Sequence, residues 1–292
     1  MDLDWLDHSE YPFKPYYMDI GGSKMHYIDQ GKGETFLFIH GTPSWSFEFR
    51  ELIKGLSHSK RCIAPDHIGF GLSSKPKKYE YTLDQHYNNL NEFIERLDLN
   101  NITMVLHDFG GPLGLRYAIE NPHRIKRFIL INTWMWSFDN DADFKKFKWF
   151  LKNPMLKFLY KYFNFSAKVL LPKSIKKRKS KDILDHYSSP FSKISERCGP
   201  IGFAKSLLNE QSFFDELWKN RNAVKQIETL LIWGMQDDLL KPKFIEKFED
   251  TFENIKTVKF QKAGHFPHEE YPVEVYKHIF RKSNQKPFSY VS

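Results

Sequence analysis

The sequence has few cysteines and no long apolar stretch. Its 292 residues include only Cys62 and Cys198, which are too few for a disulfide framework and lack metal-ligand spacing. No stretch approaches the roughly 18 apolar residues of a transmembrane helix, and the first residues lack the apolar region of a secretory signal. We therefore expect a cytoplasmic protein with reduced cysteines and no membrane partner, and none of the functions considered below requires a metal or organic cofactor.

Charge is unevenly distributed along the chain, which has a formal net charge of +8. Residues 172–181 form a basic run in a lysine-rich region, and such a run could bind nucleic acid or an anionic membrane. No DNA-binding motif accompanies it. We therefore interpret it as a solvated surface segment and expect no nucleic-acid partner. Nothing in the sequence indicates the oligomeric state.

Strand and helix patterns alternate along the first part of the chain, which predicts a mostly parallel sheet with helices on both faces. After residue 132 the alternation stops, and residues 134–222 show aromatic residues at helical spacing. The alternation then returns. We expect an α/β main domain of residues 1–133 and 223–292, with residues 134–222 inserted as a helical cap. Strands are expected at residues 16–20, 24–29, 35–39, 61–64, 102–106, 125–131, 228–233 and 256–260, and residues 282–292 are expected to form a loose tail.

Asp108 stands at a sharp turn between a predicted buried strand, residues 102–106, and a predicted helix, residues 110–119. Gly110 and Gly111 follow it, so the backbone can bend tightly there. Many hydrolases have a serine at such an elbow, and it attacks an acyl carbon. A carboxylate can instead displace a leaving group from a saturated carbon and form an alkyl ester. The simpler alternative is that Asp108 only caps the following helix, because aspartate is favoured there.

Hydrolysis of such an ester needs a base that activates water, and we expect His265 to be this base. It lies just past the last predicted strand, in a loop that opens on the same sheet edge as Asp108. The alternatives are a surface histidine or a metal pair with His268, although a pair without further ligands is weak evidence for a metal. A third residue should orient the imidazole. Asp237 and Asp238 both follow the preceding strand, and the Gly-x-x-Asp spacing favours Asp237.

Two backbone amides are expected to stabilise the negative charge that develops on the Asp108 carboxyl oxygen. One is the amide of Phe109, directly after Asp108. The other is the amide of Thr42, in the His-Gly-Thr-Pro turn after the strand at residues 35–39. This turn could be only a tight connection, but its position directly after a core strand favours the functional interpretation.

The chain resembles the haloalkane dehalogenases, α/β-hydrolases with an aspartate nucleophile, from about residue 17 to residue 280. The resemblance rests on residues 40–46, 65–73, 107–110, 234–237 and 263–266. It implies an α/β-hydrolase fold and an enzyme that displaces halide from a small haloalkane. The intermediate would be an ester on Asp108, hydrolysed by water that His265 activates. A small apolar substrate and water would be the partners, because Phe109 and the cap aromatics suit an apolar pocket.

One position departs from the family pattern. Dehalogenases of this kind usually have a tryptophan after the nucleophile, and its indole N–H binds the departing halide, whereas this chain has Phe109. Many members supply a second donor from an asparagine at the position of Thr42. Three tryptophans of the inserted segment are candidate replacements, and each could instead be a packing residue: Trp134, Trp136 and Trp149.

Two other functions are compatible with the same motifs. An epoxide hydrolase would use the same triad, with cap tyrosines as acids for the leaving oxygen. The candidates are Tyr160, Tyr162 and Tyr187, and the missing indole would not matter in that reaction. The other alternative is a ligand-binding or otherwise non-dehalogenating member of the fold, because fold does not imply function.

Overall fold

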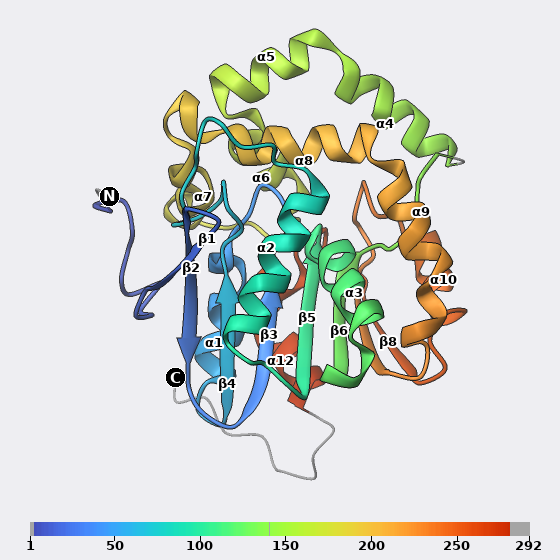
Figure 1. Ribbon diagram of the computed structural model, residues 1–292. Helices are drawn as coiled ribbons and strands as arrows, with labels where there is room; N and C mark the ends of the chain where they lie inside the picture. Colours follow the sequence, from blue (N-terminus) through green and yellow to red (C-terminus); the bar gives the residue numbers. More distant parts are fainter. Residues whose placement is uncertain (1–2, 140, 281–292) are drawn as a thin grey trace.

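A single eight-stranded sheet organises the described part of the chain, residues 3–139 and 141–280 of a computed structural model. The strand order is β1-β2-β4-β3-β5-β6-β7-β8 (Figure 1). β1 is antiparallel to β2, β2 is antiparallel to β4, and the remaining pairs are parallel. The expected mostly parallel sheet is confirmed. The predicted loose tail, residues 282–292, lies outside the described residues.

The predicted strands are all present, with small differences at their ends. The strand that leads into the elbow extends to Asp108, two residues beyond its expected end, because its pairing with the next strand continues to that residue. The strands are β1 (Tyr16–Ile20), β2 (Ser23–Gln30), β3 (Glu34–Ile39), β4 (Lys60–Pro65), β5 (Ile102–Asp108), β6 (Ile125–Thr133), β7 (Glu228–Gly234) and β8 (Ile255–Phe260).

Helices cover both faces of the sheet (Figure 1). On one face lie α2 (Leu83–Arg96), α3 (Gly110–Glu120) and α10 (Ile245–Glu249), and on the other α1 (Arg50–Leu56) and α12 (Pro272–Phe280). Side chains along each central strand alternate between the two apolar cores: Leu106 belongs to the first and Val105 to the second. Because both faces of the central strands are buried, their sequences consist of nearly continuous runs of apolar residues.

The chain between β6 and β7 is largely helical and lies over the carboxyl ends of the parallel strands (Figure 1). We call α4 to α9 the inserted helices. None of the helices in the described part of the chain is long and apolar enough to cross a membrane. The inserted helices are α4 (Ala142–Lys152), α5 (Pro154–Phe163), α6 (Leu171–Ser174), α7 (Lys181–Ser188), α8 (Cys198–Asn209) and α9 (Gln211–Lys219), with a π-helix at Ser166–Leu170.

The basic run at residues 172–181 is partly neutralised by acidic residues. Lys176 Nζ lies 2.7 Å from Asp238 Oδ2, and Lys179 Nζ lies 3.1 Å from Glu269 Oε1. Most residues of the run are nonetheless exposed, in agreement with a surface segment whose lysines pair with acidic residues that follow β7 and β8.

The substitution Gly110→Ala tests how tightly the elbow is packed. A Cβ atom at Gly110 would lie 1.9 Å from the carbonyl oxygen of Ile39 in β3, so α3 or β3 would have to shift. We expect a loss of about 1–3 kcal/mol in the free energy of unfolding, as for overpacked sites, measured by urea denaturation. Helix propensity alone favours alanine by about 1 kcal/mol. Equal or higher stability would therefore contradict the close approach of α3 and β3.

Candidate active site

Asp108 lies at the end of β5, at the apex of the turn into α3. Its φ is +48°, in the left-handed region that a strained strand-to-helix elbow requires. The hydroxyl of Thr133 in β6 donates to the carbonyl oxygen of Asp108 at 2.6 Å. A Cβ atom at Gly41 would come within 2.1 Å of Asp108 Oδ1. Glycine at this position therefore allows the carboxylate to lie directly against the turn that follows β3.

His265 lies between two buried carboxylates. Its Nδ1 is 2.6 Å from Asp237 Oδ2, and its Nε2 is 3.3 Å from Asp108 Oδ2. The three residues follow or end β8, β7 and β5, whose carboxyl ends meet at one edge because the strands are parallel. The structure thus brings Asp108, Asp237 and His265 together. Asp238 is exposed and pairs with Lys176 instead.

Asn132, near the end of β6, holds Asp237 in place, and sequence reasoning missed it. Its Nδ2 donates to Asp237 Oδ2 at 2.8 Å, and its Oδ1 accepts from the amide of Gly234 at 2.8 Å. The other carboxylate oxygen of Asp237 accepts from the amides of Leu239 and Leu240 at 2.9 and 3.0 Å. Asp237 is thus fixed by donors on both oxygens. The signal in the sequence is one polar residue near the end of an apolar strand.

A second residue that sequence reasoning missed, His107, lies behind the imidazole of His265. Its Nε2 is 2.9 Å from the carbonyl oxygen of His265, and its Nδ1 is 3.0 Å from Glu48 Oε1. A carbonyl oxygen only accepts hydrogen bonds, so Nε2 has a hydrogen, and one further proton lies between Nδ1 and Glu48. The Glu48–His107 pair therefore anchors the loop of His265 from inside the protein.

His268 lies beside this pair, and all three side chains are buried. Ligand atoms of Glu48, His107 and His268 lie within 4.8 Å of one another, a spacing that could suit a metal ion. Both nitrogens of His107 are already hydrogen-bonded, however. Of the three residues, only Glu48 and His268 have a ligand atom without a hydrogen-bond partner among the described residues. Two ligands are fewer than metal sites in proteins normally use.

Asp108, Asp237 and His265, called the triad here, favour a charged imidazole between two charged carboxylates. Burial lowers the pKa of His265, but the negative charges of Asp237 and Asp108 outweigh burial and raise this pKa to about 10. Burial raises the pKa of Asp108, yet its interactions with His265, His107 and the Thr42 amide hold that pKa below its usual value. The Thr42 amide donates to Asp108 Oδ1 at 2.8 Å. The pKa of Asp237 is lowered too, because His265 and Asn132 outweigh its burial.

A cavity of about 310 Å³ lies between the sheet edge and the inserted helices, and the triad lines it. Its lining is mostly apolar, which suits a small apolar substrate. Five other candidate residues also line it: Thr42, Phe109, Trp134, Tyr160 and Asp238.

The three candidate tryptophans lie in different surroundings. Trp134 lines the cavity, and its ring lies edge-on to the ring of Phe109, with the ring centroids 4.9 Å apart. Trp136 is buried away from the cavity and packs against Phe248, with the ring centroids 5.1 Å apart. Trp149 is 75% exposed on α4. Of the three, only Trp134 can reach a ligand beside Asp108, because neither of the other two lines the cavity.

The candidate tyrosines are also separated. Tyr160 on α5 lines the cavity. Tyr162 is 46% exposed on the same helix, and Tyr187 is buried with its hydroxyl donating to Glu269 Oε2 at 2.7 Å. Neither Tyr162 nor Tyr187 lines the cavity. Helical spacing in the sequence shows which residues share one face of a helix, but it does not show whether that face meets the cavity, the core or solvent. The sequence alone therefore could not tell which of the three tyrosines lines the cavity.

The cavity lining contains two buried donors without partners among the described residues. They are the hydroxyl of Thr42 and the indole N–H of Trp134, two residues that line the cavity and whose donor atoms are themselves almost inaccessible to solvent. Phe109, by contrast, stacks on Phe203 with ring centroids 4.5 Å apart and offers no side-chain donor. In the described structure the Thr42 amide donates to Asp108, whereas the Phe109 amide makes no hydrogen bond to it.

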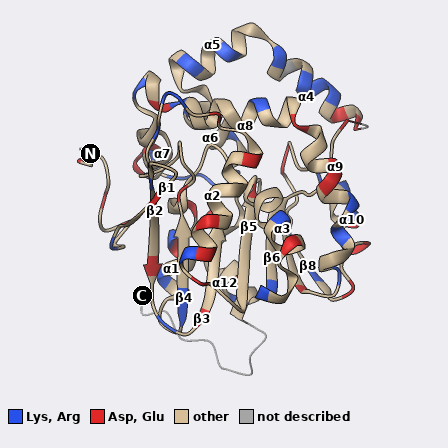
Figure 2. Cartoon of the chain, in the orientation of Figure 1, with Lys and Arg blue, Asp and Glu red and all other residues tan. Residues whose placement is uncertain are grey.

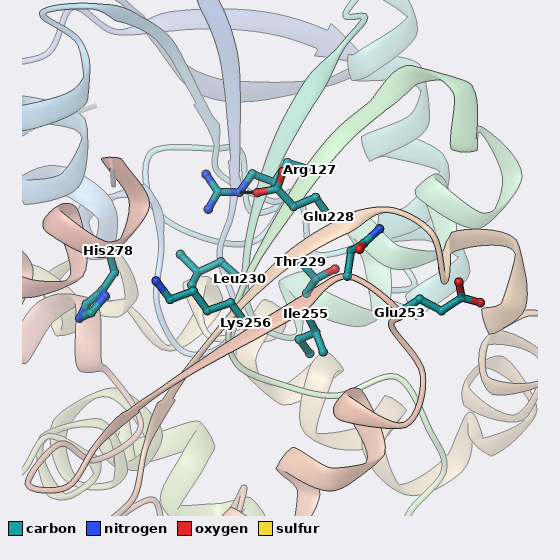
Figure 3. Close-up of a pocket in the computed structure, with 9 residues that line it drawn as sticks. Arg127, Glu228, Thr229, Leu230, Glu253, Ile255, Lys256 and His278 are labelled. Atoms are coloured by element: carbon teal, nitrogen blue, oxygen red, sulfur yellow. Dashed lines mark ion pairs between the residues drawn. The ribbon is translucent and has the colours of Figure 1, made fainter. Parts of the chain in front are cut away.

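A larger hollow of about 550 Å³ lies at the other end of the sheet, where β7 and β8 begin. Figure 3 shows its charged lining, in which Arg127 Nε pairs with Glu228 Oε1 at 2.9 Å. No member of the triad lines this hollow. We therefore place the candidate active site in the smaller cavity.

Comparison with known proteins agrees with this geometry. A model of the alpha/beta hydrolase fold family matches residues 34–272, so the chain belongs to the α/β-hydrolases and is an enzyme of that family. It is 33% identical to haloalkane dehalogenase 2 of Mycobacterium tuberculosis over 275 residues, which covers 93% of this chain and 96% of that protein. It is 32% identical to a cis-3-alkyl-4-alkyloxetan-2-one decarboxylase of Shewanella oneidensis over 278 residues, covering 92% and 87%. The crystal structure of haloalkane dehalogenase DbeA from Bradyrhizobium elkani superposes with a TM-score of 0.84 at 22% identity, covering 91% and 96%.

The charge of Asp108 is expected to control the protonation of His265. The substitution Asp108→Asn removes one of the two negative charges, so the pKa of His265 should fall from about 10. NMR titration of the imidazole would measure this. The matched control, Asp238→Asn, should leave that pKa unchanged, because Asp238 pairs with Lys176. An unchanged pKa in Asp108→Asn would contradict the ion pair.

The same pKa has a consequence for stability. Since the folded-state pKa of about 10 lies above the usual 6.5, the protonated imidazole stabilises the fold fully below about pH 6.5. This stabilisation is lost as the pH rises through about 10. In Asp108→Asn the loss, measured by urea denaturation at a series of pH values, should be smaller and should be complete at a lower pH.

Proposed function

We propose that this protein is a hydrolase of the haloalkane dehalogenase type, in which Asp108 is the nucleophile. The observation that supports this most directly is a carboxylate at the elbow, within 3.3 Å of a histidine that is itself held by Asp237. A carboxylate attacking an acyl carbon would form an anhydride that readily reverts. Attack on a saturated carbon forms a stable alkyl ester, which a histidine-activated water can hydrolyse.

The first step forms a bond between a carboxylate oxygen of Asp108 and the substrate carbon, while the carbon–halogen bond breaks and the halide leaves with its electron pair. The halide needs hydrogen-bond donors in a cavity that excludes water. Phe109 has none to offer. The indole N–H of Trp134 and the hydroxyl of Thr42 have no hydrogen-bond partner among the described residues and belong to residues that line the same cavity, and we assign them as the groups that stabilise the halide.

The second step hydrolyses the ester at the carbonyl carbon of Asp108. Ester formation removes the negative charge beside His265, so the pKa of the imidazole falls, its extra proton passes to solvent, and the neutral imidazole can act as a base. His265 takes a proton from water, and the hydroxide attacks the carbonyl carbon. Asp237 stabilises the imidazolium, and the amides of Thr42 and Phe109 stabilise the oxyanion. Collapse of the tetrahedral intermediate expels the alkoxide, which takes the proton of the newly formed carboxyl group, so the alcohol leaves and the Asp108 carboxylate is regenerated.

Residues 134–222 are proposed to act as a cap domain on a main domain of residues 1–133 and 223–292. Two observations support these limits: β6 ends at Thr133 and β7 begins at Glu228, and cap residues line the cavity opposite Asp108. The cap would then determine which substrates fit.

A second candidate function is decarboxylation of a β-lactone, the reaction named for the Shewanella relative. Attack of Asp108 on the ring carbon that bears the lactone oxygen would open the ring and leave a carboxylate on the neighbouring carbon. Loss of CO₂ would then form the alkene and expel Asp108, without water. The observation that favours this reaction is Phe109, because a carboxylate leaving group does not need the indole donor that halide does. Epoxide hydrolysis is less favoured, since Tyr160 is the only one of the three candidate tyrosines that lines the cavity.

The variant His265→Ala separates these reactions. With a bromoalkane it should form an ester on Asp108 that cannot be hydrolysed, and intact-mass spectrometry with peptide mapping would detect the adduct. Asp108→Asn should form none. The same His265→Ala protein should still release CO₂ from a β-lactone if decarboxylation is the function, because that route needs no base. A lack of adduct with bromoalkanes, together with no halide release by the wild type, would contradict the dehalogenase proposal.

The halide donor is tested by Trp134→Phe, with Trp136→Phe as its matched control. Both indole N–H groups are buried and unpartnered among the described residues, but only Trp134 lines the cavity. A hydrogen bond to a charged group is worth about 1.5–3 kcal/mol, so Trp134→Phe should slow bromoalkane conversion by about 10- to 100-fold, and Trp136→Phe should not. Equal rates for the two variants would exclude Trp134 as the donor.

A further inference from the structure

The outer surface of α4 and α5 is unusually apolar. Eight large apolar side chains are substantially exposed in the described part of the chain, and five of them lie on these two consecutive helices. They are Trp149 (75% exposed), Met155 (62%), Phe158 (48%), Tyr162 (46%) and Phe163 (60%). We call this group the outer cap face.

Lysines surround the outer cap face. Five exposed lysines of α4 and α5 have no ion pair with any described residue, in contrast to Lys176 and Lys179 of the basic run, which do. Figure 2 shows the corresponding basic segments along both helices. The one acidic residue of the two helices, Asp143, already pairs with Lys241 and Lys243. The free lysines are Lys145, Lys146, Lys152, Lys157 and Lys161.

Exposed aromatic side chains among free lysines are typical of helices that lie in the interface of an anionic bilayer. The rings enter the boundary between headgroups and acyl chains, while the lysines contact the phosphates. A protein partner would more often cover a patch with mixed charges or a central cluster depleted of lysine. Trp149 is flanked along α4 by Lys145 and Lys152, so apolar insertion and charge contact would occur on the same helix.

We propose that the outer cap face binds the surface of an anionic lipid membrane. This proposal differs from the expectation, drawn from the sequence, that the protein has no membrane partner. That expectation was based on the lack of a spanning segment, and peripheral binding requires none. The sequence could not reveal the surface, because it does not show that α4 and α5 lie outermost, with α8 beneath them (Figure 1).

The position of the outer cap face relative to the active site suggests what membrane binding would achieve. A cavity of about 150 Å³ lies between α4, α5 and α8, and it shares Leu151, Tyr160 and Ala204 with the cavity that contains Asp108. A membrane-bound cap would thus place this second cavity beside the bilayer. The substrate class would then be apolar molecules dissolved in lipid, an extension that rests on the proposed function.

Vesicle co-sedimentation tests membrane binding without measuring activity. The wild type should bind phosphatidylcholine vesicles that contain phosphatidylglycerol, and should bind pure phosphatidylcholine vesicles much more weakly. Lys145→Glu with Lys152→Glu should weaken binding by about tenfold or more, and Trp149→Ser with Phe163→Ser should weaken it comparably. The charge-matched control, Lys32→Glu with Lys256→Glu, alters exposed lysines at the opposite end of the sheet and should bind like the wild type.

Three results would overturn the proposal: no binding of the wild type to anionic vesicles, equal loss of binding in the charge-matched control, or self-association through this face instead. The last would appear in analytical ultracentrifugation as an oligomer that Trp149→Ser with Phe163→Ser dissociates. Circular dichroism of each variant checks the fold, and the lysine variants alter only exposed side chains. Because binding is measured without a substrate, failure of the catalytic proposal would leave this result interpretable.

Discussion

The placement of one imidazole between two buried carboxylates is the interaction on which the rest of the site depends. Burying any one of these charges alone would cost several kcal/mol, on the order expected for an unpaired ion. Together they compensate one another, with His265 Nδ1 2.6 Å from Asp237 and Nε2 3.3 Å from Asp108. In the proposed mechanism the arrangement would change during the reaction: when Asp108 becomes an ester, the imidazole would lose the negative charge that helps to raise its pKa.

The surrounding structure holds these three groups in fixed positions relative to one another. Asn132 and the amides after β7 fix Asp237, while the Glu48–His107 pair fixes the loop of His265. Asp108 is fixed by its elbow, whose left-handed φ of +48° is maintained by close packing of glycines against neighbouring strands. The parallel sheet gives these contacts a common edge. The inserted helices then enclose the cavity, whose lining includes Thr42 and Trp134, each with a side-chain donor that has no partner among the described residues.

Much of this could be predicted from the sequence, because strand periodicity and turn residues are local. The order of Asp108, Asp237 and His265 along the chain, each directly after a predicted strand, was sufficient to place them at one edge. The exposure of Trp149, the burial of Trp136 and the contact of Tyr187 with Glu269 could not be predicted, because they depend on how the inserted helices pack. Glu48 and His107 were missed for a similar reason: a polar residue within an apolar segment reveals no partner until the fold brings one to it.

Isotope labelling of a single turnover in H₂¹⁸O tests most directly whether Asp108 is the nucleophile. With enzyme in excess over a bromoalkane, attack by Asp108 predicts that ¹⁸O enters the carboxylate of Asp108, where peptide mass spectrometry would find it. The alcohol from that first turnover should contain ¹⁶O, which came from the aspartate. If ¹⁸O instead appeared in the alcohol and Asp108 remained unlabelled, water would have displaced the halide directly, and the covalent mechanism would be wrong.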